Sequence, residues 1–244
     1  MDNLLLPGTI KERLEKIKSG IALSCAKTGR PPGEISILAA TKSQPPEKIL
    51  AAVSVGIAIF GENYLQEAEK KISEIGRNVQ WHFIGHLQAN KAKKAGQLFD
   101  MVQTVDSLKV AQKLDAASAS ENKVLPILIE VNIGEEPQKF GVLPAGVPEF
   151  VRSLSGLKNL EIRGLMCMPP QLPAEQARLC FKKMSQIFLQ LKSARQGNLN
   201  PKTLSMGMSG DFTVAVEEGS TMVRIGTALF GDRVNLRFTG PRKP

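Results

Sequence analysis

The stretch "EISILAATKSQPPEKILAAVSVG", residues 34–56, decides the fold, because it contains one predicted strand followed by one predicted helix. Its first part, residues 34–42, is almost continuously apolar, as expected of a strand that is buried on both faces. Its last part, residues 47–56, has apolar residues at i, i+3 and i+4 and ends in a glycine, which is typical of an amphipathic helix. The stretch therefore predicts one β-then-α unit.

Similar units recur along the chain. Seven further apolar runs are expected to be strands, at residues 57–63, 79–85, 101–106, 125–133, 160–168, 203–208 and 222–231. Amphipathic stretches lie between many of these runs, and an extra N-terminal helix is expected over residues 9–27. Eight units in 244 residues predict the α/β fold class and a single (β/α)8 TIM barrel, forming one domain over residues 1–244. A doubly wound sheet is the alternative, but it typically has fewer strands.

The charge of the chain favours an anionic partner. There are 32 lysine and arginine residues against 23 acidic residues, which gives a formal net charge of +9. Nucleic acid, a membrane surface or a phosphorylated small molecule would all fit this surplus. No apolar run approaches ~20 residues, and the first residues resemble neither a signal peptide nor an anchor, so no membrane partner is expected. No helix-turn-helix or RNA-binding motif is present, so no specific nucleic acid is expected.

The cysteines and histidines argue against a disulfide framework and a metal site. The three cysteines are odd in number and scattered, which favours a reducing compartment, so we expect a cytoplasmic protein. His82 and His86 are four residues apart, but they lie in a predicted strand that runs into a turn. They would therefore not share one face of a helix, and no metal site is expected.

Two glycine-rich segments mark a possible anion site. In a TIM barrel the functional residues lie at the C-terminal ends of the strands, and phosphate sites commonly form after strands seven and eight. The segments "SMGMSGD" (205–211) and "RIGT" (224–227) occupy these positions here. Backbone N–H groups at such turns bind phosphate, although the same glycines could simply form tight turns.

Two basic residues have an unusual context. Lys42 follows the first predicted strand and could be solvated, bind a phosphate, or act as an amine nucleophile if desolvated. Arg224 lies within an apolar strand, where it needs either a structural carboxylate or a ligand as acceptor. Opposite a phosphate site, Lys42 could form a Schiff base with a phosphorylated aldehyde. A sugar-phosphate aldolase and a pyridoxal-phosphate protein both fit this pattern.

Taken together, seven motifs in the chain resemble the YggS/PROSC family of pyridoxal phosphate homeostasis proteins, which are similar in turn to the N-terminal barrel of alanine racemase. The motifs are "AATKSQP", "FGENYLQEAEKK", "WHFIGHLQANKAK", "VDS", "EVNIGEEPQKFGV", "IRGLMCMPP" and "LSMGMSGDFTVAVEEGSTMVRIGTALFG". The resemblance covers residues 9–233, the expected core of the domain. It implies an alanine racemase N-terminal-domain-like barrel that carries pyridoxal 5′-phosphate covalently at Lys42.

The resemblance also implies eight cofactor-binding positions and no catalytic residue. One is the Schiff-base lysine, one is an arginine that faces the pyridine nitrogen, and three bind the phosphate. These five are Lys42, Arg224, Ser209, Gly226 and Thr227, respectively. The remaining three are expected to lie around the pocket, and they are Asn63, Met206 and His86.

The same residues limit the expected chemistry. An arginine does not give up its proton to the pyridine nitrogen, so the ring stays neutral and is a weaker electron sink. Racemisation needs an acid–base group on each face of the substrate, and the only tyrosine, Tyr64, is interpreted as a structural or helix-cap residue. We expect a protein that holds pyridoxal phosphate and takes part in intracellular vitamin B6 and amino-acid homeostasis without robust catalysis.

Two other functions remain open at this stage. One is a single-domain, pyridoxal-phosphate-dependent amino-acid racemase of low activity, and the other is a nucleic-acid binder suggested by the charge of +9. For the leading hypothesis, the expected partners are pyridoxal phosphate and pyridoxal-phosphate-dependent apoenzymes, and the expected oligomeric state is a monomer.

Overall fold

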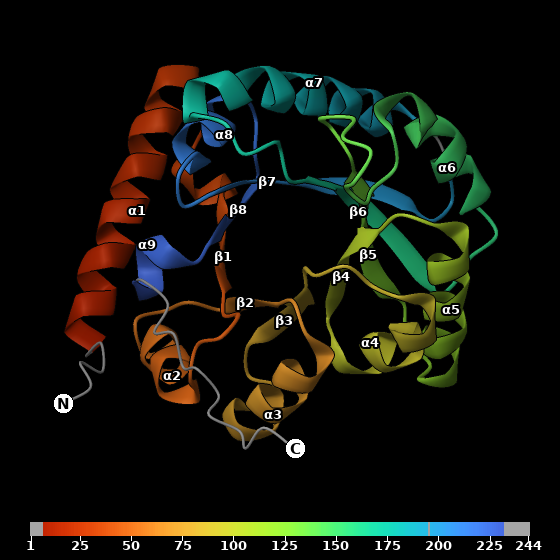
Figure 1. Ribbon diagram of the computed structural model, residues 1–244, viewed down its shortest axis with the longest axis horizontal. Helices are drawn as coiled ribbons and strands as arrows, with labels where there is room; N and C mark the ends of the chain where they lie inside the picture. The colour runs from red at the N-terminus through yellow and green to blue at the C-terminus, as the bar shows by residue number, and fades with distance from the viewer. Residues whose placement is uncertain (1–6, 195, 232–244) are drawn as a thin grey trace, which may run out of the picture.

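A computed structural model describes residues 7–194 and 196–231 of the chain. The strands are β1 (Ser36–Ala40), β2 (Ile59–Glu62), β3 (Gln80–Phe83), β4 (Met101–Val105), β5 (Leu125–Val131), β6 (Leu160–Cys167), β7 (Leu199–Met208) and β8 (Met222–Ile225). They are parallel and form a closed barrel in sequence order, in which β1 pairs with both β2 and β8. Figure 1 shows this ring with the helices outside it. The predicted (β/α)8 barrel is therefore confirmed.

The helices cover the outer face of the barrel. The α-helices are α1 (Pro7–Thr28), α2 (Pro46–Ser54), α3 (Leu65–Ile75), α4 (Ala92–Leu98), α5 (Leu108–Ser120), α6 (Val147–Ser153), α7 (Ala174–Ser193), α8 (Phe212–Glu217) and α9 (Thr227–Phe230). Three short 3-10 helices span Pro32–Glu34, Ala89–Lys91 and Pro144–Gly146. The helix α1 is the predicted extra N-terminal helix, and it packs along α8 and α9 (Figure 1).

The last predicted strand is shorter than its apolar run. The run 222–231 was expected to be one strand, but β8 ends at Ile225 and α9 follows after Gly226. Leu229 and Phe230 of α9 are fully buried. A short buried helix is as apolar as a buried strand, so the apolar pattern alone could not separate the two.

The barrel has an apolar outer layer and a partly polar interior. Outward-facing strand residues pack against the helices in one large core cluster that includes Phe60, Trp81 and Phe181. A smaller cluster of Met101, Leu128 and Met166 comes from three neighbouring strands. This arrangement leaves room for polar side chains inside the barrel near the C-terminal ends of the strands.

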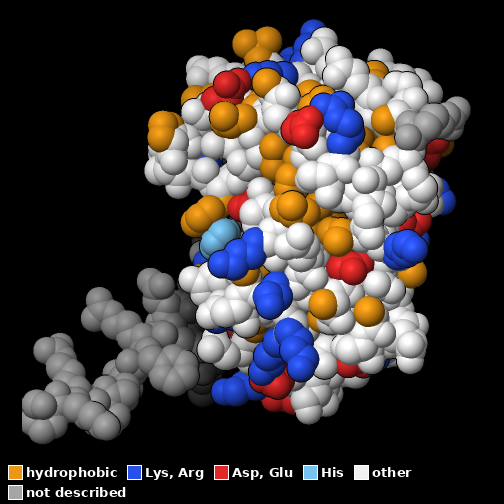
Figure 2. Space-filling model, turned by 90° about the vertical axis from the view of Figure 1, so that its right-hand side faces the viewer, with side chains coloured by type: hydrophobic (Ala, Val, Ile, Leu, Met, Phe, Trp, Pro, Cys, Tyr) orange, Lys and Arg blue, Asp and Glu red, His pale blue; other side chains and the backbone are white. Residues whose placement is uncertain are grey.

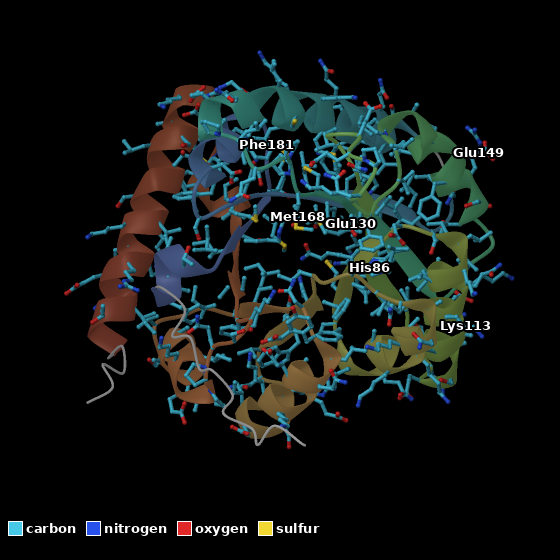
Figure 3. The ribbon with its side chains drawn as sticks, in the orientation of Figure 1. His86, Lys113, Glu130, Glu149, Met168 and Phe181 are labelled. Atoms are coloured by element: carbon cyan, nitrogen blue, oxygen red, sulfur yellow. The ribbon has the colours of Figure 1, made fainter. Side chains whose placement is uncertain are left out.

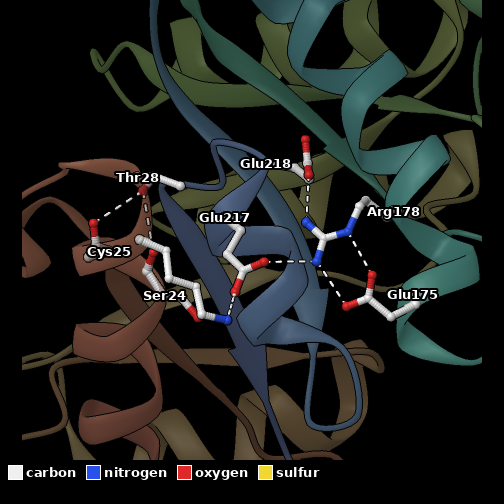
Figure 4. A network of polar contacts seen from close by, with 8 residues as sticks. Ser24, Cys25, Thr28, Glu175, Arg178, Glu217 and Glu218 are labelled. Atoms are coloured by element: carbon white, nitrogen blue, oxygen red, sulfur yellow. Dashed lines mark hydrogen bonds and ion pairs between the residues drawn. The ribbon is translucent and has the colours of Figure 1, made fainter.

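A network of charged residues joins three helices outside the barrel (Figure 4). Arg178 on α7 donates to Glu175 on its own helix, to Glu217 on α8 and to Glu218 just after α8, at 2.6–2.9 Å. Lys27 on α1 also contacts Glu217, at 2.6 Å. The network therefore links α1, α7 and α8, the helix that follows the "SMGMSGD" segment.

The surface carries both charge signs. Figure 2 shows basic side chains interspersed with acidic and apolar ones on the face it presents, rather than gathered in one continuous basic patch. Among the residues that the structure describes, none forms a helix long and apolar enough to cross a membrane.

Candidate functional site

A cavity of about 310 Å³ opens at the C-terminal ends of the strands. Six of the eight predicted site residues line it, namely Lys42, Asn63, Ser209, Arg224, Gly226 and Thr227. Further lining residues, which are not among the eight predicted site residues, are Ala40, Gln44, Ile84, Met168, Met208 and Gly210. Residues from both ends of the chain thus meet around one small space, because β1 and β8 are neighbours in the closed barrel.

The backbone around Lys42 is held on both sides. The carbonyl oxygen of Thr41 accepts a hydrogen bond from Lys71 Nζ at 2.7 Å. Ser43 has a φ of 58°, a conformation that non-glycine residues rarely adopt, and its N–H donates to Glu67 at 3.0 Å. The Lys42 amine lies 4.9 Å from the centre of the Tyr64 ring. The two hydrogen bonds hold the backbone on either side of Lys42, which is half-buried and lines the cavity.

A buried ion pair supports this segment from the helix layer. Lys71 on α3 contacts Glu62 at the end of β2 at 2.6 Å, and the Thr41 hydroxyl donates to the same carboxylate oxygen at 2.5 Å. Burial raises the pKa of Glu62, and the charge of Lys71 opposes this shift. A lysine on an amphipathic helix is most simply expected to be solvated, and for Lys71 this expectation is wrong, because only 6% of the residue is exposed.

The two glycine-rich segments meet at Ser209. The Ser209 hydroxyl oxygen accepts hydrogen bonds from the backbone N–H groups of Gly226, at 3.3 Å, and Ala228, at 3.2 Å. Gly207 has a φ of +91°, and a Cβ there would lie 2.5 Å from the Ala215 side chain. Only glycine suits this position, so the loop can turn back toward β8. Two amide N–H groups thus donate to one oxygen, that of Ser209, which lines the cavity with Gly226. Amides at such a turn can bind an anion.

Arg224 is buried without a carboxylate partner. It is 4% exposed, and its Nη1 donates to the carbonyl and hydroxyl oxygens of Ser205 at 2.9 and 2.8 Å. Its Nη2 donates to the Cys167 carbonyl at 2.8 Å. None of these bonds uses Nε, and no carboxylate of the described residues lies within ion-pair distance. Burial lowers the pKa of the guanidinium. The structural-carboxylate alternative for Arg224 is therefore not supported.

A chain of hydrogen bonds continues from Arg224 through the barrel. Ser205 Oγ donates to Gln103 Oε1 at 2.8 Å, and Gln103 Nε2 lies 2.9 Å from His82 Nδ1. Burial lowers the pKa of His82 to about 3, so the imidazole is neutral. Because an amide nitrogen only donates, His82 Nδ1 is the acceptor of this bond. Gln103 and Ser205 thus fix the orientation of Arg224 from inside the barrel.

Two predicted site residues lie outside this cavity. Met206 is fully buried in the main core cluster, on the side of β7 that faces the helices. His86 lines a neighbouring cavity and stacks on Phe140, with ring centres 3.4 Å apart. The methionine that lines the 310 Å³ cavity from β7 is Met208.

The arrangement suits a small phosphorylated carbonyl compound. A primary amine, Lys42, and a cluster of N–H and hydroxyl groups around Ser209 face one cavity. An amine can add to a carbonyl carbon, and amides at such a turn can hold an anion. Both parts of the predicted chemistry therefore lie within one space.

Comparisons with known proteins agree with this geometry. A family model described as "Alanine racemase, N-terminal domain" matches residues 36–234. The pyridoxal phosphate homeostasis protein of Vibrio alginolyticus is 42% identical over 231 residues, which are 92% of this chain and 98% of that protein. The chain belongs to the family of pyridoxal phosphate homeostasis proteins, which share the alanine racemase N-terminal domain.

Solved structures extend the comparison. A crystal structure of an unknown protein from Bifidobacterium adolescentis has a TM-score of 0.87 at 31% identity, covering 94% of this chain and 97% of that chain. The structure of PipY from Synechococcus elongatus with pyridoxal phosphate bound has a TM-score of 0.79 at 33% identity. That match covers 91% of this chain and 100% of PipY.

Proposed function

We propose that this protein binds pyridoxal 5′-phosphate in the 310 Å³ cavity and acts in intracellular vitamin B6 and amino-acid homeostasis. The observation that carries the proposal is the position of the Lys42 amine and the Ser209 cluster on the walls of the same cavity. The names of the relatives and the bound pyridoxal phosphate in PipY support it.

The residues of the cavity fit each part of the cofactor. The amides of Gly226 and Ala228, which donate to the Ser209 hydroxyl oxygen in this structure, would donate to the phosphate, and the Ser209 hydroxyl would add a further donor. Lys42 Nζ would form the covalent bond to the aldehyde carbon. Arg224 would face the pyridine nitrogen, because its hydrogen bonds to the protein leave Nε uncommitted. When bound, the cofactor supplies an aldehyde conjugated to an aromatic ring.

The charge of Arg224 restrains the reactivity of the ring. The guanidinium donates hydrogen bonds but does not transfer a proton, so it leaves the pyridine nitrogen neutral. Ser205 and Cys167 fix its two terminal nitrogens, so that it cannot turn away. The cofactor held here would therefore be a weak electron sink, which favours storage over catalysis.

The cavity offers one acid–base group near Lys42, which is Lys42 itself. Among the described residues that line it, the other polar side chains are amides, hydroxyls and Arg224. Tyr64 is the N-cap residue of α3 and is 47% exposed, as the interpretation of it as a helix-cap neighbour predicts. Racemisation needs a second group on the opposite face, so we propose a non-catalytic or at most feebly active protein.

The wider role is a part of the same proposal. We propose that the protein works as a cytoplasmic monomer that passes the cofactor to pyridoxal-phosphate-dependent apoenzymes. The three thiols support a reducing location, because Cys25 and Cys167 are buried and Cys180 is free. A racemase of low activity is the alternative, and exchange of the α-proton of alanine with D₂O above the rate of free cofactor would favour it.

The absorption spectrum tests the covalent attachment. We expect the purified protein, reconstituted with pyridoxal phosphate, to be yellow, because a carbon–nitrogen double bond extends the conjugation of the ring. Borohydride should bleach the band and leave the mass of the reduced cofactor on Lys42. Lys42→Ala should lose the band.

The matched control is Lys70→Ala, since Lys70 is an exposed lysine on α3. It should keep the band and its reduction product. A colourless wild-type protein after reconstitution, or a cofactor mass on a lysine other than Lys42, would overturn the proposal.

A further inference from the structure

A second, larger cavity adjoins the first. It has a volume of about 570 Å³ and shares Met168, Met208 and Gly210 with the 310 Å³ cavity. Figure 3 shows Met168, Glu130 and His86 close to one another near the centre of the view. The two methionines, which are 39% and 38% exposed, stand between the cavities, so a small molecule in one would lie next to a molecule in the other.

Glu130 on β5 is the unexplained group of this cavity. It is 5% exposed and lines the cavity, yet its Oε2 has no hydrogen-bond partner among the residues that the structure describes. A buried carboxylate without a donor is costly, and most buried polar groups in native proteins have a partner. The proposed function makes no use of Glu130, so this carboxylate lacks a role there.

The charges around Glu130 leave room for one more positive charge. Asp106 raises the pKa of Glu130 and Arg224 lowers it, while burial contributes most and brings it to about 7. Asp106 itself lies near His86, with Oδ2 4.0 Å from Nδ1. Glu130 and Asp211, which also lines the cavity, both act on the buried Arg224, and a proton on Glu130 reduces the negative charge near neutral pH. A bound cation could replace that proton.

The other polar groups of the cavity also favour a cation over an anion. Lys139 is paired with Glu136 at 2.6 Å and donates to the Pro169 carbonyl at 3.1 Å. The side-chain amide of Asn132 donates to the carbonyls of Glu136 and Lys139. Lys139 and the Asn132 amide are therefore already paired within the protein, whereas Oε2 of Glu130 is not.

The remaining walls are apolar. Phe140 stacks on His86, and the cavity is also lined by Pro169, Pro170 and Leu172. Phe140 and Leu172 are 55% and 43% exposed, so apolar surface faces the opening. Such walls suit a short aliphatic chain.

We propose that this cavity is a subsite for a small aliphatic ammonium compound, whose N–H groups donate to Glu130 beside the cofactor pocket. The position next to the cofactor rests on the proposed function, whereas binding to Glu130 does not require it. The ligand class is an aliphatic amine without a carboxylate, which separates this subsite from one for α-amino acids.

Calorimetric titration with N,N-dimethylbutylamine, N,N,N′,N′-tetramethyl-1,4-diaminobutane and butyrate tests the subsite on the reconstituted protein, because protonated tertiary amines donate a hydrogen bond but cannot form an imine with the cofactor aldehyde. We expect both amines to bind and butyrate not to bind. Glu130→Gln should weaken amine binding by about tenfold or more, the usual effect of losing a charged hydrogen-bond partner. Affinity should fall about tenfold from pH 8 to pH 6, because Glu130 takes up a proton near pH 7.

The control is Glu149→Gln on α6, because Glu149 lies far from the mouth in Figure 3 and its side chain is 77% exposed. It should leave amine binding unchanged. Equal binding of butyrate, or equal affinity in wild type and Glu130→Gln, would overturn the subsite. The yellow band recorded on the same samples keeps the two ideas apart, because a band without amine binding contradicts only the subsite. Amine binding without a band contradicts only the cofactor proposal.

Discussion

Two buried glutamates at the barrel mouth differ in their ion pairing, although Oε2 of each has no hydrogen-bond partner among the described residues. Glu62 at the end of β2 is fully buried, and its Oε1 receives the Lys71 ammonium and the Thr41 hydroxyl. Glu130 on β5 is 5% exposed and has no ion-pair partner among the described residues. Burial raises the pKa of both, but only Glu62 has a contacting cation that opposes the shift.

The difference follows from where each side chain points. Glu62 meets Lys71 from α3, so the helix layer supplies its partner and the pair stabilises the segment that carries Lys42. Glu130 points into a cavity, where only a ligand or a proton can be its partner. The same residue type is therefore structural on one side of the mouth and available for binding on the other.

Removing the cation of the Lys71–Glu62 pair should have the largest effect. Lys71→Met leaves Glu62 buried without its cation, and we expect it to lower the free energy of unfolding by about 3–5 kcal/mol. Urea unfolding at pH 7 measures this loss. Changing Glu62→Leu as well should restore much of it, because no buried charge then remains.

Lys70→Met is the matched control, since Lys70 is the exposed neighbour on the same helix. We expect a change within about 0.5 kcal/mol. If Lys71→Met were as mild as Lys70→Met, the contrast between the two glutamates would fail on the Glu62 side.

Glu130, which has no ion pair among the described residues, should make the free energy of unfolding depend on pH. The pKa of Glu130 is raised from 4.5 to about 7, so the folded state binds a proton more tightly than the unfolded state. Its contribution to stability is present below pH 4.5 and is lost as pH rises toward 7. We expect the stability of Glu130→Gln relative to wild type to rise by about 3 kcal/mol between pH 4 and pH 8. Urea unfolding across this range measures it.

Glu149→Gln provides the comparison for this series, because its exposed carboxylate should give no such pH trend. A flat difference between Glu130→Gln and wild type would mean that Glu130 is ionised at no cost in the folded protein. Added N,N-dimethylbutylamine should reduce the pH trend of the wild type, since it replaces the proton.

The fold could be predicted from the sequence because its signal is local. Each strand buried on both faces is an apolar run, and seven of the eight runs contain a strand of the barrel, while the run 203–208 covers only the second part of β7, which begins at Leu199. Helix α4 was not expected, because "AKKAGQL" is short and rich in lysine. The division of the run 222–231 was also missed, since α9 is too short and too buried to show a helical pattern.

The candidate site could be predicted only in part. Lys42, Ser209 and Arg224 stand at strand ends or in an apolar strand, where a polar residue is conspicuous. Met206 was chosen instead of Met208, because the positive φ of Gly207 and a register shift in the β7–β8 pairing change which side chain faces the cavity. Such a shift is a tertiary feature.

The ion pairs near the site were the feature that could least be predicted from the sequence. The partners in the Glu62 pair are nine residues apart on different elements, and nothing in the sequence separates Lys71 from the exposed Lys70. Glu130 is the acidic residue in the apolar run 125–133, and this position was the signal in the sequence that marked it as unusual. An acidic residue in a doubly buried strand needs a partner, as the same argument requires for Arg224.

Arg178 extends the comparison to ion pairs that face water, and its effect should be the smallest. Its guanidinium contacts three glutamates, but its side chain is 26% exposed and solvent screens each pair. We expect Arg178→Ala to lower the melting temperature by about 3 °C or less, measured by differential scanning calorimetry. Arg152→Ala, which removes one exposed pair with Glu149, is the control and should cause no measurable change.

The salt dependence of stability distinguishes the buried Lys71–Glu62 pair from the more exposed pairs of Arg178. Raising the NaCl concentration to about 1 M shortens the screening length to roughly 3 Å, so the effect of Arg178→Ala should largely vanish. The effect of Lys71→Met should persist, because water and ions do not reach a pair in which the side chains are 8% and 0% exposed. If both effects declined together with salt, burial would not be what distinguishes the Glu62 pair, and the free carboxylate of Glu130 would need a different explanation.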